Sequence, residues 1–459
     1  MLRDLASFAA ASGGVLRGAN ASFGEVATDT RSLARGALFV ALRGERFDGH
    51  DFVVEAAARG AAGAVVSRAL PLATPQIVVQ DTLAALARFA SAWRGEFAGT
   101  VVGVTGSNGK TTVKEMLGAI LARMGGCLIT QGNLNNHIGV PLTLCRLGPA
   151  YRYAVIEMGA NHAREIAHLA ALAEPEVGLV INAGPAHLEG FGSLEGVARG
   201  KGEMFEALGI EDTAVINADD RFAALWHGLA RLAGRVVTFG MRERAEVSAA
   251  AVTGRVTAEG FATEFELETP AGSRHVTLNL AGEHNVMNAL AAAAAALAAG
   301  ATLEAIEQGL ESVRPVTGRL QAKPARHGAR LIDDAYNANP GSVRAGLRAL
   351  AGLPGERWLV LGEMAELGPD SPRLHAEIGG YARECGVARL YAIGAQAQFA
   401  VEAFGAGARW FASVEELIAA LEPELVPGLT VLVKGSRVNR LERVTAALGA
   451  HGDAAAGVH

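Results

Sequence analysis

A glycine-rich loop between an apolar run and a helical pattern constrains this chain more than any other feature. Residues 106–112 read GSNGKTT, after the apolar run 100–105 (TVVGVT) and before a helical stretch that runs to about residue 124. A loop between a buried strand and a helix N-terminus presents backbone N–H groups that can cradle phosphates. Lys110 would neutralise β- and γ-phosphate charge, and the Thr111 hydroxyl would complete a Mg²⁺ shell. The residues of this predicted ATP site are Gly106, Ser107, Asn108, Gly109, Lys110, Thr111 and Thr112.

The loop is a variant of the common phosphate-binding pattern. The pattern G-x-x-x-x-G-K-[ST] requires glycine at position 104. This chain has Val104 there, with Gly103 and Gly106 nearby. A G-K-T triplet can also arise by chance in a glycine-rich turn, but the strand–loop–helix context favours a phosphate site.

The length of 459 residues predicts about three domains at roughly 150 residues each. Strand-like and helical runs alternate over residues 100–239, which predicts a doubly wound parallel sheet. Val- and Thr-rich alternation over 246–280 predicts antiparallel hairpins appended to that sheet. We therefore expect an α/β fold with a small N-terminal domain (1–81), a central P-loop-type domain with a mostly parallel sheet (82–314) and a Rossmann-like C-terminal domain (315–459).

Charge and composition argue against several classes of protein. The chain has 41 Lys and Arg against 47 Asp and Glu, a net charge of −6, so no strong basic field indicates a nucleic-acid partner. The longest apolar stretch, 285–301, is mostly alanine and too weakly hydrophobic for a membrane span, and residues 1–12 lack the apolar core of a secretion signal. Three scattered cysteines have no disulfide or zinc spacing. We expect a cytoplasmic protein with a disordered tail from His451.

Further motifs extend the pattern along nearly the whole chain. Residues 104–115 (VTGSNGKTTVKE) resemble the ATP loop of the Mur ligases, the ATP-dependent amide-forming enzymes of peptidoglycan synthesis. Motifs similar to that family occur in the same order at 28–32 (TDTRS), 44–50 (GERFDGH), 132–141 (GNLNNHIGVP), 157–161 (EMGAN), 185–191 (PAHLEGF) and 333–340 (DDAYNANP). They are most similar to the branch that joins D-alanyl-D-alanine to UDP-N-acetylmuramoyl-tripeptide.

Three side chains are predicted metal ligands beside Thr111. Glu157 follows a predicted buried strand, where a carboxylate at the sheet edge can hold Mg²⁺ next to the loop, and the resemblance implies the same role. The resemblance also implies that His187 binds a second metal ion and that Lys201, carbamylated by CO₂, is a ligand. The alternatives are an exposed strand-end acid, a loop histidine without a function and a solvated surface lysine.

Other residues are expected around the nucleotide. Asn285 and Asn288 stand three apart and can share a helix face, and the resemblance places them beside the adenine; a helix N-cap is the alternative for Asn285. The resemblance implies that Arg319 reaches the ATP phosphates, with an interdomain salt bridge as the alternative. It places Asp334 near the ribose, although Asp333 and Asp334 could instead cap a turn.

The resemblance also implies substrate sites in all three domains. The residues expected to hold the uridine nucleotide sugar are Arg31, Ser32, Asp48 and His50, faced by Asn135 and Asn136 of the central domain. Asn337 and Asn339, on the same loop as Asp334, are also expected to bind substrate. The residues expected near the incoming amine, together with loop 362–368, are Lys434, Ser436 and Arg437.

The implied reaction is an ATP-dependent amide ligation through an acyl phosphate. The tripeptide carboxylate takes the γ-phosphoryl group and releases ADP, and the amine of D-alanyl-D-alanine then displaces phosphate to give the pentapeptide. Lys110, Arg319 and Mg²⁺ would neutralise charge, with His187 and Lys201 holding metal. Alternatives are addition of a single amino acid, addition of glutamate to folate, a binding protein that hydrolyses ATP slowly, and a nucleic-acid NTPase. The third tripeptide residue is open between diaminopimelate and lysine, and we expect a monomer.

Overall fold

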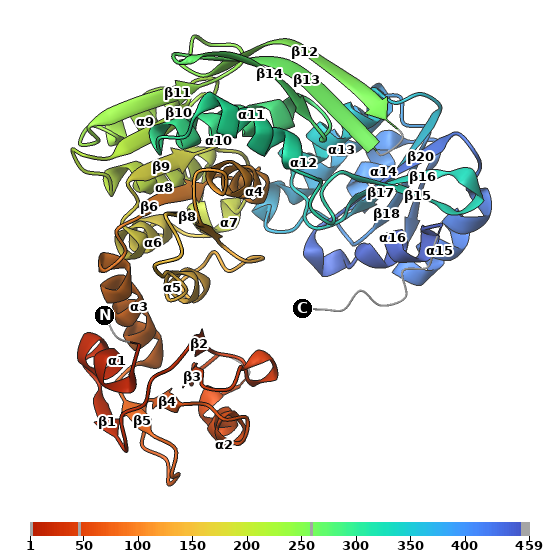
Figure 1. The fold of residues 1–459 in the computed structure, drawn as a ribbon. Coiled ribbons are helices and arrows are strands. Elements are labelled where there is room, and N and C mark those ends of the chain that lie inside the picture. The colour runs from red at the N-terminus through yellow and green to blue at the C-terminus, as the bar shows by residue number, and fades with distance from the viewer. Residues whose placement is uncertain (1–2, 45–46, 258–259, 451–459) are drawn as a thin grey trace.

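The computed structural model describes residues 3–44, 47–257 and 260–450, so the tail predicted from His451 lies outside the described residues, as do positions 45 and 46 of the motif at 44–50. Three mainly parallel sheets follow one another along the chain, with an antiparallel three-stranded sheet between the second and the third (Figure 1). In Figure 1 the N-terminal unit lies at the bottom, the central unit above it and the C-terminal unit to the right. The domain boundaries at 81/82 and 314/315 stay predictions.

The N-terminal unit is built on a five-stranded sheet of order β1-β5-β4-β3-β2, in which β1 is antiparallel to β5 and the other neighbours are parallel. Its strands are β1 (Val15–Arg17), β2 (Val26–Ala27), β3 (Leu38–Val40), β4 (Gly63–Val66) and β5 (Gln76–Val78). Its helical elements are α1 (Leu5–Ser12), η1 (Thr30–Ser32), η2 (Gly49–Phe52) and α2 (Val53–Ala58). Helix α3 (Thr82–Gly95) is capped by Asp81 and stacks Phe89 on Phe8 of α1, which attaches this sheet to the next unit.

The central sheet has the order β11-β10-β9-β6-β8-β7, and every neighbouring pair is parallel, which confirms the predicted doubly wound sheet. Its strands are β6 (Thr100–Thr105), β7 (Cys127–Ile129), β8 (Tyr153–Glu157), β9 (Val177–Val180), β10 (Thr213–Asn217) and β11 (Arg235–Phe239). Its helices are α4 (Lys110–Leu121), α5 (Gly139–Leu144), α6 (Glu165–Ala173), α7 (Leu188–Phe191), α8 (Leu194–Glu206), α9 (Ala223–Leu229), α10 (Glu283–Ala298) and α11 (Leu303–Ser312).

Both faces of this sheet are buried, which explains the unbroken apolar run of β6. Val101 packs with α6 and α8, whereas Val102 and Val104 pack with α4 and α10 on the opposite face. Val104, at the position where the common pattern has glycine, is thus a core residue. Alanine-rich α10 is almost fully buried, and in the described part of the chain no helix is long and apolar enough to cross a membrane.

The antiparallel strands β12 (Ser248–Thr257), β13 (Gly260–Thr269) and β14 (Gly272–Leu278) form a sheet of their own. An isolated bridge between Phe239 and Val247 connects it with the edge of the central sheet. In Figure 1 these long strands arch over the top of the molecule toward the C-terminal unit, where Phe261 packs against the third core. The antiparallel hairpins therefore also pack against the C-terminal unit.

The C-terminal sheet has the order β15-β16-β20-β17-β18-β19, with β15 antiparallel and the rest parallel. Its strands are β15 (Gln321–Pro324), β16 (Arg330–Asp334), β17 (Glu356–Gly362), β18 (Arg389–Ile393), β19 (Ala408–Phe411) and β20 (Leu429–Lys434). Its helical elements are η3 (Arg326–Gly328), α12 (Pro340–Ala351), η4 (Gly368–Asp370), α13 (Ser371–Glu384), α14 (Gln398–Phe404), α15 (Val414–Leu421), η5 (Glu422–Glu424), η6 (Arg437–Asn439) and α16 (Glu442–Leu448). Separate cores cover its two faces, as expected of a Rossmann-like unit.

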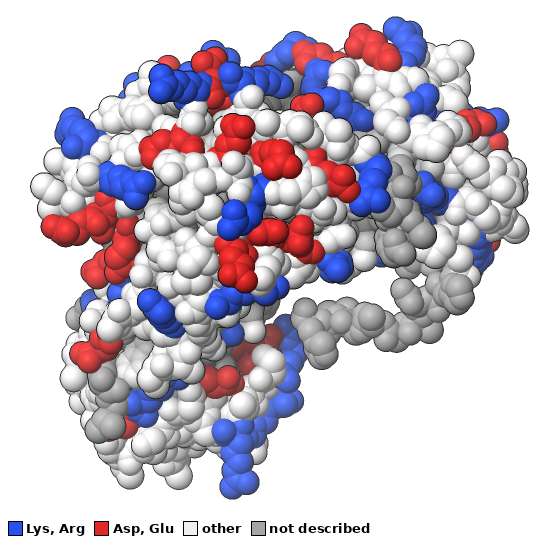
Figure 2. Space-filling model, turned by 45° about the horizontal axis from the view of Figure 1, so that its top comes forward, with Lys and Arg blue, Asp and Glu red and all other residues white. Residues whose placement is uncertain are grey.

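Acidic and basic side chains alternate over the face drawn in Figure 2, without a continuous basic stripe. This face therefore gives no sign of a general basic field.

Candidate active site

A cavity of about 990 Å³ lies between the carboxyl ends of the central and C-terminal sheets. Its walls come from the loops after β6, β8 and β16 and from the first turns of α4, α10 and α12. Ligands of open α/β sheets bind at this edge because loops and helix N-termini converge there. The predicted nucleotide-site residues that line it are Ser107, Asn108, Gly109, Lys110, Thr111, Thr112, Asn285, Asn288, Arg319 and Asp334.

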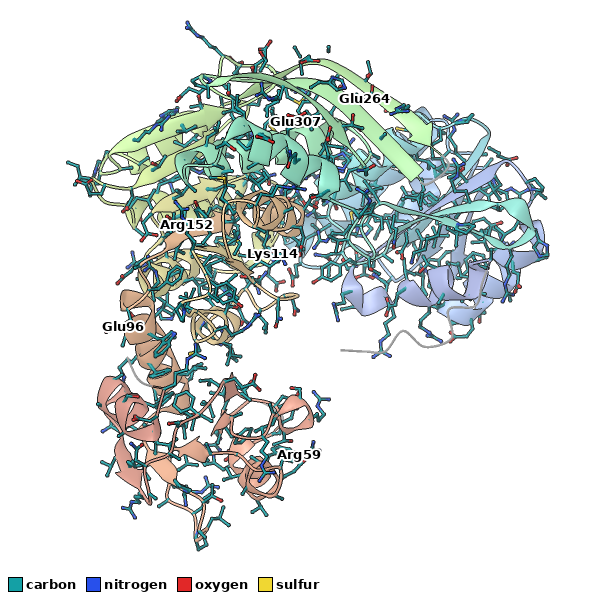
Figure 3. The ribbon with its side chains drawn as sticks, viewed as in Figure 1. Arg59, Glu96, Lys114, Arg152, Glu264 and Glu307 are labelled. Carbon is teal, nitrogen blue, oxygen red and sulfur yellow. The ribbon has the colours of Figure 1, made fainter. Side chains whose placement is uncertain are left out.

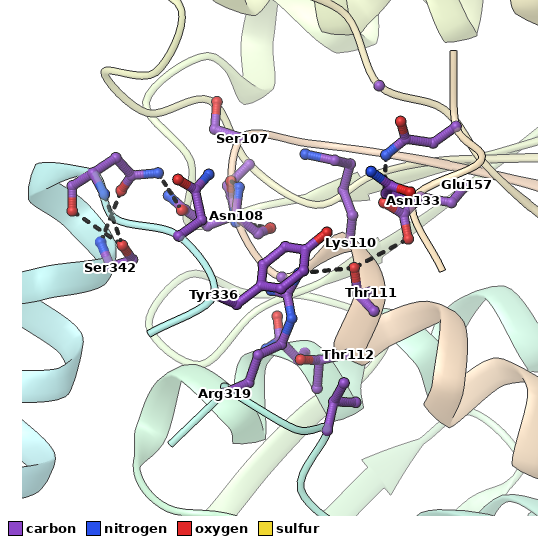
Figure 4. Close-up of a pocket in the computed structure, with 18 of the residues that line it drawn as sticks. Ser107, Asn108, Lys110, Thr111, Thr112, Asn133, Glu157, Arg319, Tyr336 and Ser342 are labelled. Carbon is purple, nitrogen blue, oxygen red and sulfur yellow. Dashed lines mark hydrogen bonds between the residues drawn. The ribbon is translucent and has the colours of Figure 1, made fainter. Parts of the chain in front are cut away.

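The phosphate loop joins β6 to α4 in a conformation that needs glycine. Gly109 has a φ of 85°, and a Cβ atom there would lie 2.3 Å from Oδ1 of Asn288. Lys110, labelled in Figure 4, begins α4, and its ammonium donates to the carbonyl oxygen of Gly106 at 2.7 Å. The loop is therefore held tightly around the start of the helix, where an anion would meet backbone N–H groups.

Lys110 is the lysine of α4 that faces the cavity. Burial lowers the pKa of Lys110; the Glu157 carboxylate opposes this shift, and the Arg319 guanidinium adds to it. Lys114, one turn further along α4, is buried and donates to the carbonyl oxygen of Thr130 at 2.8 Å (Figure 3). An anion bound in the loop would offset the cost of holding the Lys110 cation there.

A carboxylate and a hydroxyl meet beside the loop. Glu157 ends β8 and is only 2% exposed, so the alternative of an exposed strand-end acid is wrong. Its Oε2 accepts from the Thr111 hydroxyl at 3.2 Å, and its Oε1 accepts from Nδ2 of Asn135 at 2.8 Å (Figure 4). These hard oxygen donors are of the kind that Mg²⁺ prefers. Within the described ranges, no group of three or more His, Cys, Asp or Glu side chains could hold a metal by itself.

Arg319 reaches from the C-terminal segment to the phosphate loop. Its Nη2 donates to the Thr111 hydroxyl oxygen at 3.0 Å, and its guanidinium carbon lies 4.6 Å from the centre of the Tyr336 ring. Among the ion pairs formed by the described residues, none involves Arg319, so the alternative of an interdomain salt bridge is wrong. The arginine is therefore available to a ligand phosphate.

Asn285 and Asn288 belong to the first turns of α10, whose N-cap residue is Gly282, so the N-cap alternative for Asn285 is wrong. Nδ2 of Asn288 donates to Oδ1 of Asn285 at 3.1 Å, and Nδ2 of Asn285 donates to the carbonyl oxygen of Ala281 at 2.9 Å. The adjacent His284 also lines the cavity, and burial lowers the pKa of His284 to about 4. The part of the cavity wall formed by His284, Asn285 and Asn288 is therefore polar and uncharged near neutral pH.

The two consecutive aspartates make different contacts. Asp333 accepts from the N–H of Ala335 at 3.2 Å, as in a turn. Asp334 lines the cavity and accepts from Nζ of Lys434 at 2.6 Å. Burial raises the pKa of Asp334, and the Lys434 cation opposes that shift. Asp334 and Lys434 thus form a nearly buried pair at the cavity wall.

Lys201 is buried in α8, so the alternative of a solvated surface lysine is wrong. Its Nζ donates to the carbonyl oxygen of Ala160 at 3.0 Å and lies 5.3 Å from the centre of the Phe191 ring. Burial, followed by the repulsion of Lys110, lowers the pKa of Lys201 to about 7. Its side chain is close to the cavity wall at Ala160 without being one of the lining residues.

His187 lines the cavity and contacts a residue of the C-terminal unit. Its Nδ1 pairs with the carboxylate of Glu366, and this contact holds the pKa of Glu366 below its usual value. Both residues have positive φ, 55° for His187 and 62° for Glu366, which is unusual for non-glycine residues. The predicted metal ligand His187 thus forms a contact between the central and the C-terminal units.

The remaining predicted substrate residues of the central and C-terminal units fall into two groups. Those that line the cavity are Asn135, Asn136, Asn337, Asn339 and Lys434. Ser436 is buried outside it, where its hydroxyl accepts from the N–H of Ala365 at 2.9 Å and donates to the carbonyl oxygen of Ala338 at 3.3 Å. Arg437 is exposed, with its guanidinium carbon 5.6 Å from the centre of the Tyr336 ring.

The four predicted residues of the N-terminal unit are not part of this cavity's lining. Arg31 and Ser32 are exposed on η1, and the side chain of Arg31 pairs with Asp29. Asp48 contacts the buried ring of His50 at 2.5 Å, and the backbone N–H of Ser67 donates to Nε2 of His50 at 2.8 Å. In Figure 1 the N-terminal unit is set apart from the loops of the central unit. This structure therefore does not bring the four residues of the N-terminal unit together with Asn135 and Asn136.

Several lining residues were missed by sequence reasoning, among them Arg164, Tyr336 and Arg348. Tyr336 lies inside the DDAYNANP motif, so an aromatic ring in a polar loop was a usable signal. Arg348 lies near the end of α12 and faces the cavity only because that helix packs beside the loop, which no local pattern indicates.

The fold and site define a nucleotide-binding α/β protein whose phosphate loop is met by an arginine from a following α/β unit. The chain belongs to the Mur ligase family: the Mur ligase middle domain matches residues 104–296, the Mur ligase glutamate ligase domain matches 318–437, and the Mur ligase family catalytic domain matches 23–94.

Relatives and solved structures place the chain beside one branch of that family. It is 46% identical to the UDP-N-acetylmuramoyl-tripeptide–D-alanyl-D-alanine ligase of Escherichia coli K12, over 96% of each chain. A crystal structure of MurF from Acinetobacter baumannii matches with a TM-score of 0.89 and 36% identity, over 97% of this chain and 98% of that one. The MurF ligase of Thermotoga maritima in complex with ADP matches with a TM-score of 0.79 and 29% identity, over 92% and 96%.

Proposed function

We propose that this chain is an ATP-dependent ligase that joins D-alanyl-D-alanine to UDP-N-acetylmuramoyl-tripeptide, giving UDP-N-acetylmuramoyl-pentapeptide, ADP and phosphate. The named relative from Escherichia coli, aligned over 96% of both chains, supports the substrates. The observation that carries the chemistry is the contact of Arg319 with Thr111, because it brings a cation from the C-terminal unit to the phosphate loop beside Glu157.

ATP would lie in the cavity with its phosphates on loop 106–112 and its base near Asn285 and Asn288. The ADP complex of the Thermotoga maritima relative supports nucleotide use. The Thr111 hydroxyl and the Glu157 carboxylate fit Mg²⁺, since this ion binds through one or two protein oxygens together with substrate phosphates. Bound there, Mg²⁺ would neutralise phosphate charge during phosphoryl transfer.

The protein contributes position and charge. Lys110 and Arg319 would hold the γ-phosphoryl group while a tripeptide carboxylate oxygen attacks phosphorus and the bond to ADP breaks. The amine of the dipeptide then attacks the carbonyl carbon, loses a proton and expels phosphate. An acyl phosphate reacts readily with water, so contacts between the central and C-terminal units, such as His187 with Glu366, would help to exclude solvent.

Lys201 and His187 are proposed as further metal ligands. A carbamate forms when a neutral amine attacks CO₂ and loses a proton, and the low pKa of Lys201 near 7 supplies that neutral amine. The resulting carboxylate-like oxygens suit Mg²⁺ better than an ammonium does. His187 would have to exchange Glu366 for the metal ion.

The other assignments follow from the same proposal. Arg31, Ser32, Asp48 and His50 would bind the uridine nucleotide sugar, which requires the N-terminal unit to approach the cavity. The amine substrate would meet the C-terminal side, which carries Asn337, Asn339, Lys434, Ser436 and Arg437. We propose a cytoplasmic monomer; the free thiols of Cys127, Cys145 and Cys385 support a reducing compartment.

The test is phosphate release with ATP, Mg²⁺ and UDP-N-acetylmuramoyl-tripeptide, with and without D-alanyl-D-alanine, followed by mass spectrometry of the nucleotide product. We expect release that requires the dipeptide and a mass gain that matches its condensation. Turnover with a single amino acid in place of the dipeptide would reject the proposed acceptor. Phosphate release that needs neither the dipeptide nor a single amino acid would reject the proposal that the chain is a ligase. Parallel reactions with tripeptides ending in diaminopimelate or lysine would identify the preferred third residue.

A further inference from the structure

Tyr336 occupies a position between the nucleotide side and the C-terminal side of the cavity. It follows β16, and its backbone N–H donates to the carbonyl oxygen of Gly318 at 3.2 Å. Gly318 has a φ of 73°, and a Cβ atom there would lie 3.3 Å from Cβ of Tyr336. The two loops are thus fixed against each other, and the residue that follows Gly318 is Arg319.

The Tyr336 ring lies close to two guanidinium groups from different segments. The guanidinium carbon of Arg319 is 4.6 Å from the ring centre and that of Arg437 is 5.6 Å away. Aromatic faces attract arginine cations at these distances, and the attraction grows where water is excluded. Tyr336 is half-buried and lines the cavity, so part of this contact is shielded from solvent.

The Arg319 guanidinium contacts both the Tyr336 ring and the Thr111 hydroxyl. Arginine has several rotatable bonds, and on the cavity side the guanidinium of Arg319 donates a hydrogen bond to the Thr111 hydroxyl. In Figure 4 the Tyr336 ring lies beside the Arg319 side chain, which extends to Thr111 and the phosphate loop. Without the ring, the guanidinium would lose the support that restricts it to this direction.

Arg437 connects the same ring to the loop that follows the neighbouring strand β20. It begins η6 after β20, and Asn439 of that turn donates to the carbonyl oxygen of Glu363 at 2.8 Å. The ring therefore contacts a cation directed at the phosphate loop and a cation on the loop beside 362–368.

We propose that Tyr336 is a positioning residue that holds Arg319 toward the phosphate loop and links it to Arg437, so that one aromatic ring aligns the phosphate side and the amine side of the site. This inference rests on the proposed ligase function for its turnover measurements, whereas nucleotide affinity tests it independently.

The experiment compares Tyr336→Phe and Tyr336→Leu with the unsubstituted chain. The readouts are the affinity for a non-hydrolysable ATP analogue by calorimetry, kcat, and KM for ATP and for D-alanyl-D-alanine. Tyr336→Phe keeps the ring and should stay within about threefold in every readout. Tyr336→Leu should weaken analogue binding about 10-fold and lower kcat about 10- to 100-fold, because the Arg319 guanidinium is no longer held in place. It should also raise KM for the dipeptide through Arg437.

Two controls separate positioning from general damage. Tyr381→Leu removes a similar contact in the same unit, in which the Arg344 guanidinium carbon lies 4.7 Å from the ring centre, and Tyr381 does not line the cavity. It should leave analogue affinity and kcat unchanged. In an Arg319→Ala background, Tyr336→Leu should have little further effect on analogue affinity, since the residue it positions is gone.

Unchanged analogue affinity in Tyr336→Leu would overturn the inference, and so would an equal loss in Tyr336→Phe or full additivity with Arg319→Ala. Circular dichroism and the unfolding midpoint of each variant identify a fold defect, and Tyr336→Met then replaces Tyr336→Leu in the same comparison. If the unsubstituted chain fails to turn over tripeptide and dipeptide, the proposed function fails, while the calorimetric comparison still decides the role of Tyr336.

Discussion

Nδ2 of Asn339 donates a hydrogen bond of 2.7 Å to Oδ1 of Asn108, which joins the start of α12 to the phosphate loop across 231 residues of sequence. The same asparagine caps α12, because its Oδ1 accepts from the N–H of Ser342 at 2.9 Å. One side chain therefore fixes a helix of the C-terminal unit and also touches the loop expected to bind phosphate.

We predict that Asn339→Ser weakens ATP binding about threefold to tenfold with little change in stability. Serine is a good N-cap but is too short to reach Asn108, so only the contact with the loop is lost. Asn339→Ala removes the cap as well and should cost a further ~1 kcal/mol in the free energy of unfolding. Nucleotide calorimetry and urea unfolding measure the two effects; equal ATP affinity in Asn339→Ser and the unsubstituted chain would contradict the prediction.

Lys110→Ala should reduce ADP formation about 100- to 1000-fold, because the cation that faces the cavity from α4 is removed. Coupled detection of ADP at saturating tripeptide and dipeptide measures this. Arg123→Ala is the matched control near the far end of α4, where the exposed arginine donates to the side chain of Gln308 at 2.9 Å. It should keep full activity. Retained activity in Lys110→Ala would reject the assigned role of the loop.

Local sequence patterns predicted those site residues that lie at the end of a single strand or in the loop directly after it. The run 100–105 alternates between two buried faces, and the loop after it has the expected strand–loop–helix context. Glu157 was found for the same reason, since it ends a buried parallel strand next to β6. The parallel order of the central sheet and the antiparallel hairpins also followed from periodicity.

Contacts between distant segments could not be predicted in this way. The pair of His187 with Glu366 and the bond of Asn339 to Asn108 depend on how the central and C-terminal units pack. The burial of Lys201 depends on how α8 packs within the central unit against the segment around Ala160. Local patterns do not indicate the short edge strands β15 and β19, because their sequences, QAKP and ARWF, have little apolar periodicity. The hairpins were expected to be appended to the central sheet; they form a sheet of their own that the bridge between Phe239 and Val247 joins to the edge of the central sheet.

Lys201→Arg should lower ligase activity at least about 10-fold, because arginine keeps a cation but cannot form a carbamate. With ¹³C-bicarbonate, NMR should show a carbamate carbon in the unsubstituted chain and not in the variant. Arg199→Lys is the control: this side chain is 60% exposed on the same helix, so a lysine there should remain an ammonium and give no additional signal. Full activity in Lys201→Arg without a carbamate signal in either protein would contradict the proposal.

The pair of Asp48 with His50 should make the N-terminal unit less stable in acid. The backbone N–H and ring of His50 lower the pKa of Asp48 from 3.8 to about 2. Since the folded state favours the carboxylate, its contribution is present above about pH 4 and is lost as the pH falls toward 2. Asp48→Asn keeps an acceptor for the backbone but loses the charge, so it should increase hydrogen exchange around His50 and Ser67 at pH 7.

That difference between Asp48→Asn and the unsubstituted chain should begin to shrink as the pH is lowered from about 4 to 3, because Asp48 then binds a proton in the unfolded state while the folded state still holds the carboxylate. Hydrogen exchange followed by mass spectrometry, with a correction for the intrinsic pH dependence of exchange, measures it on the full chain. Asp51→Asn substitutes an exposed acid on the same 3₁₀ turn and should match the unsubstituted chain throughout. A difference of constant size from pH 7 to 3 would mean that Asp48 acts through its shape and not through its charge.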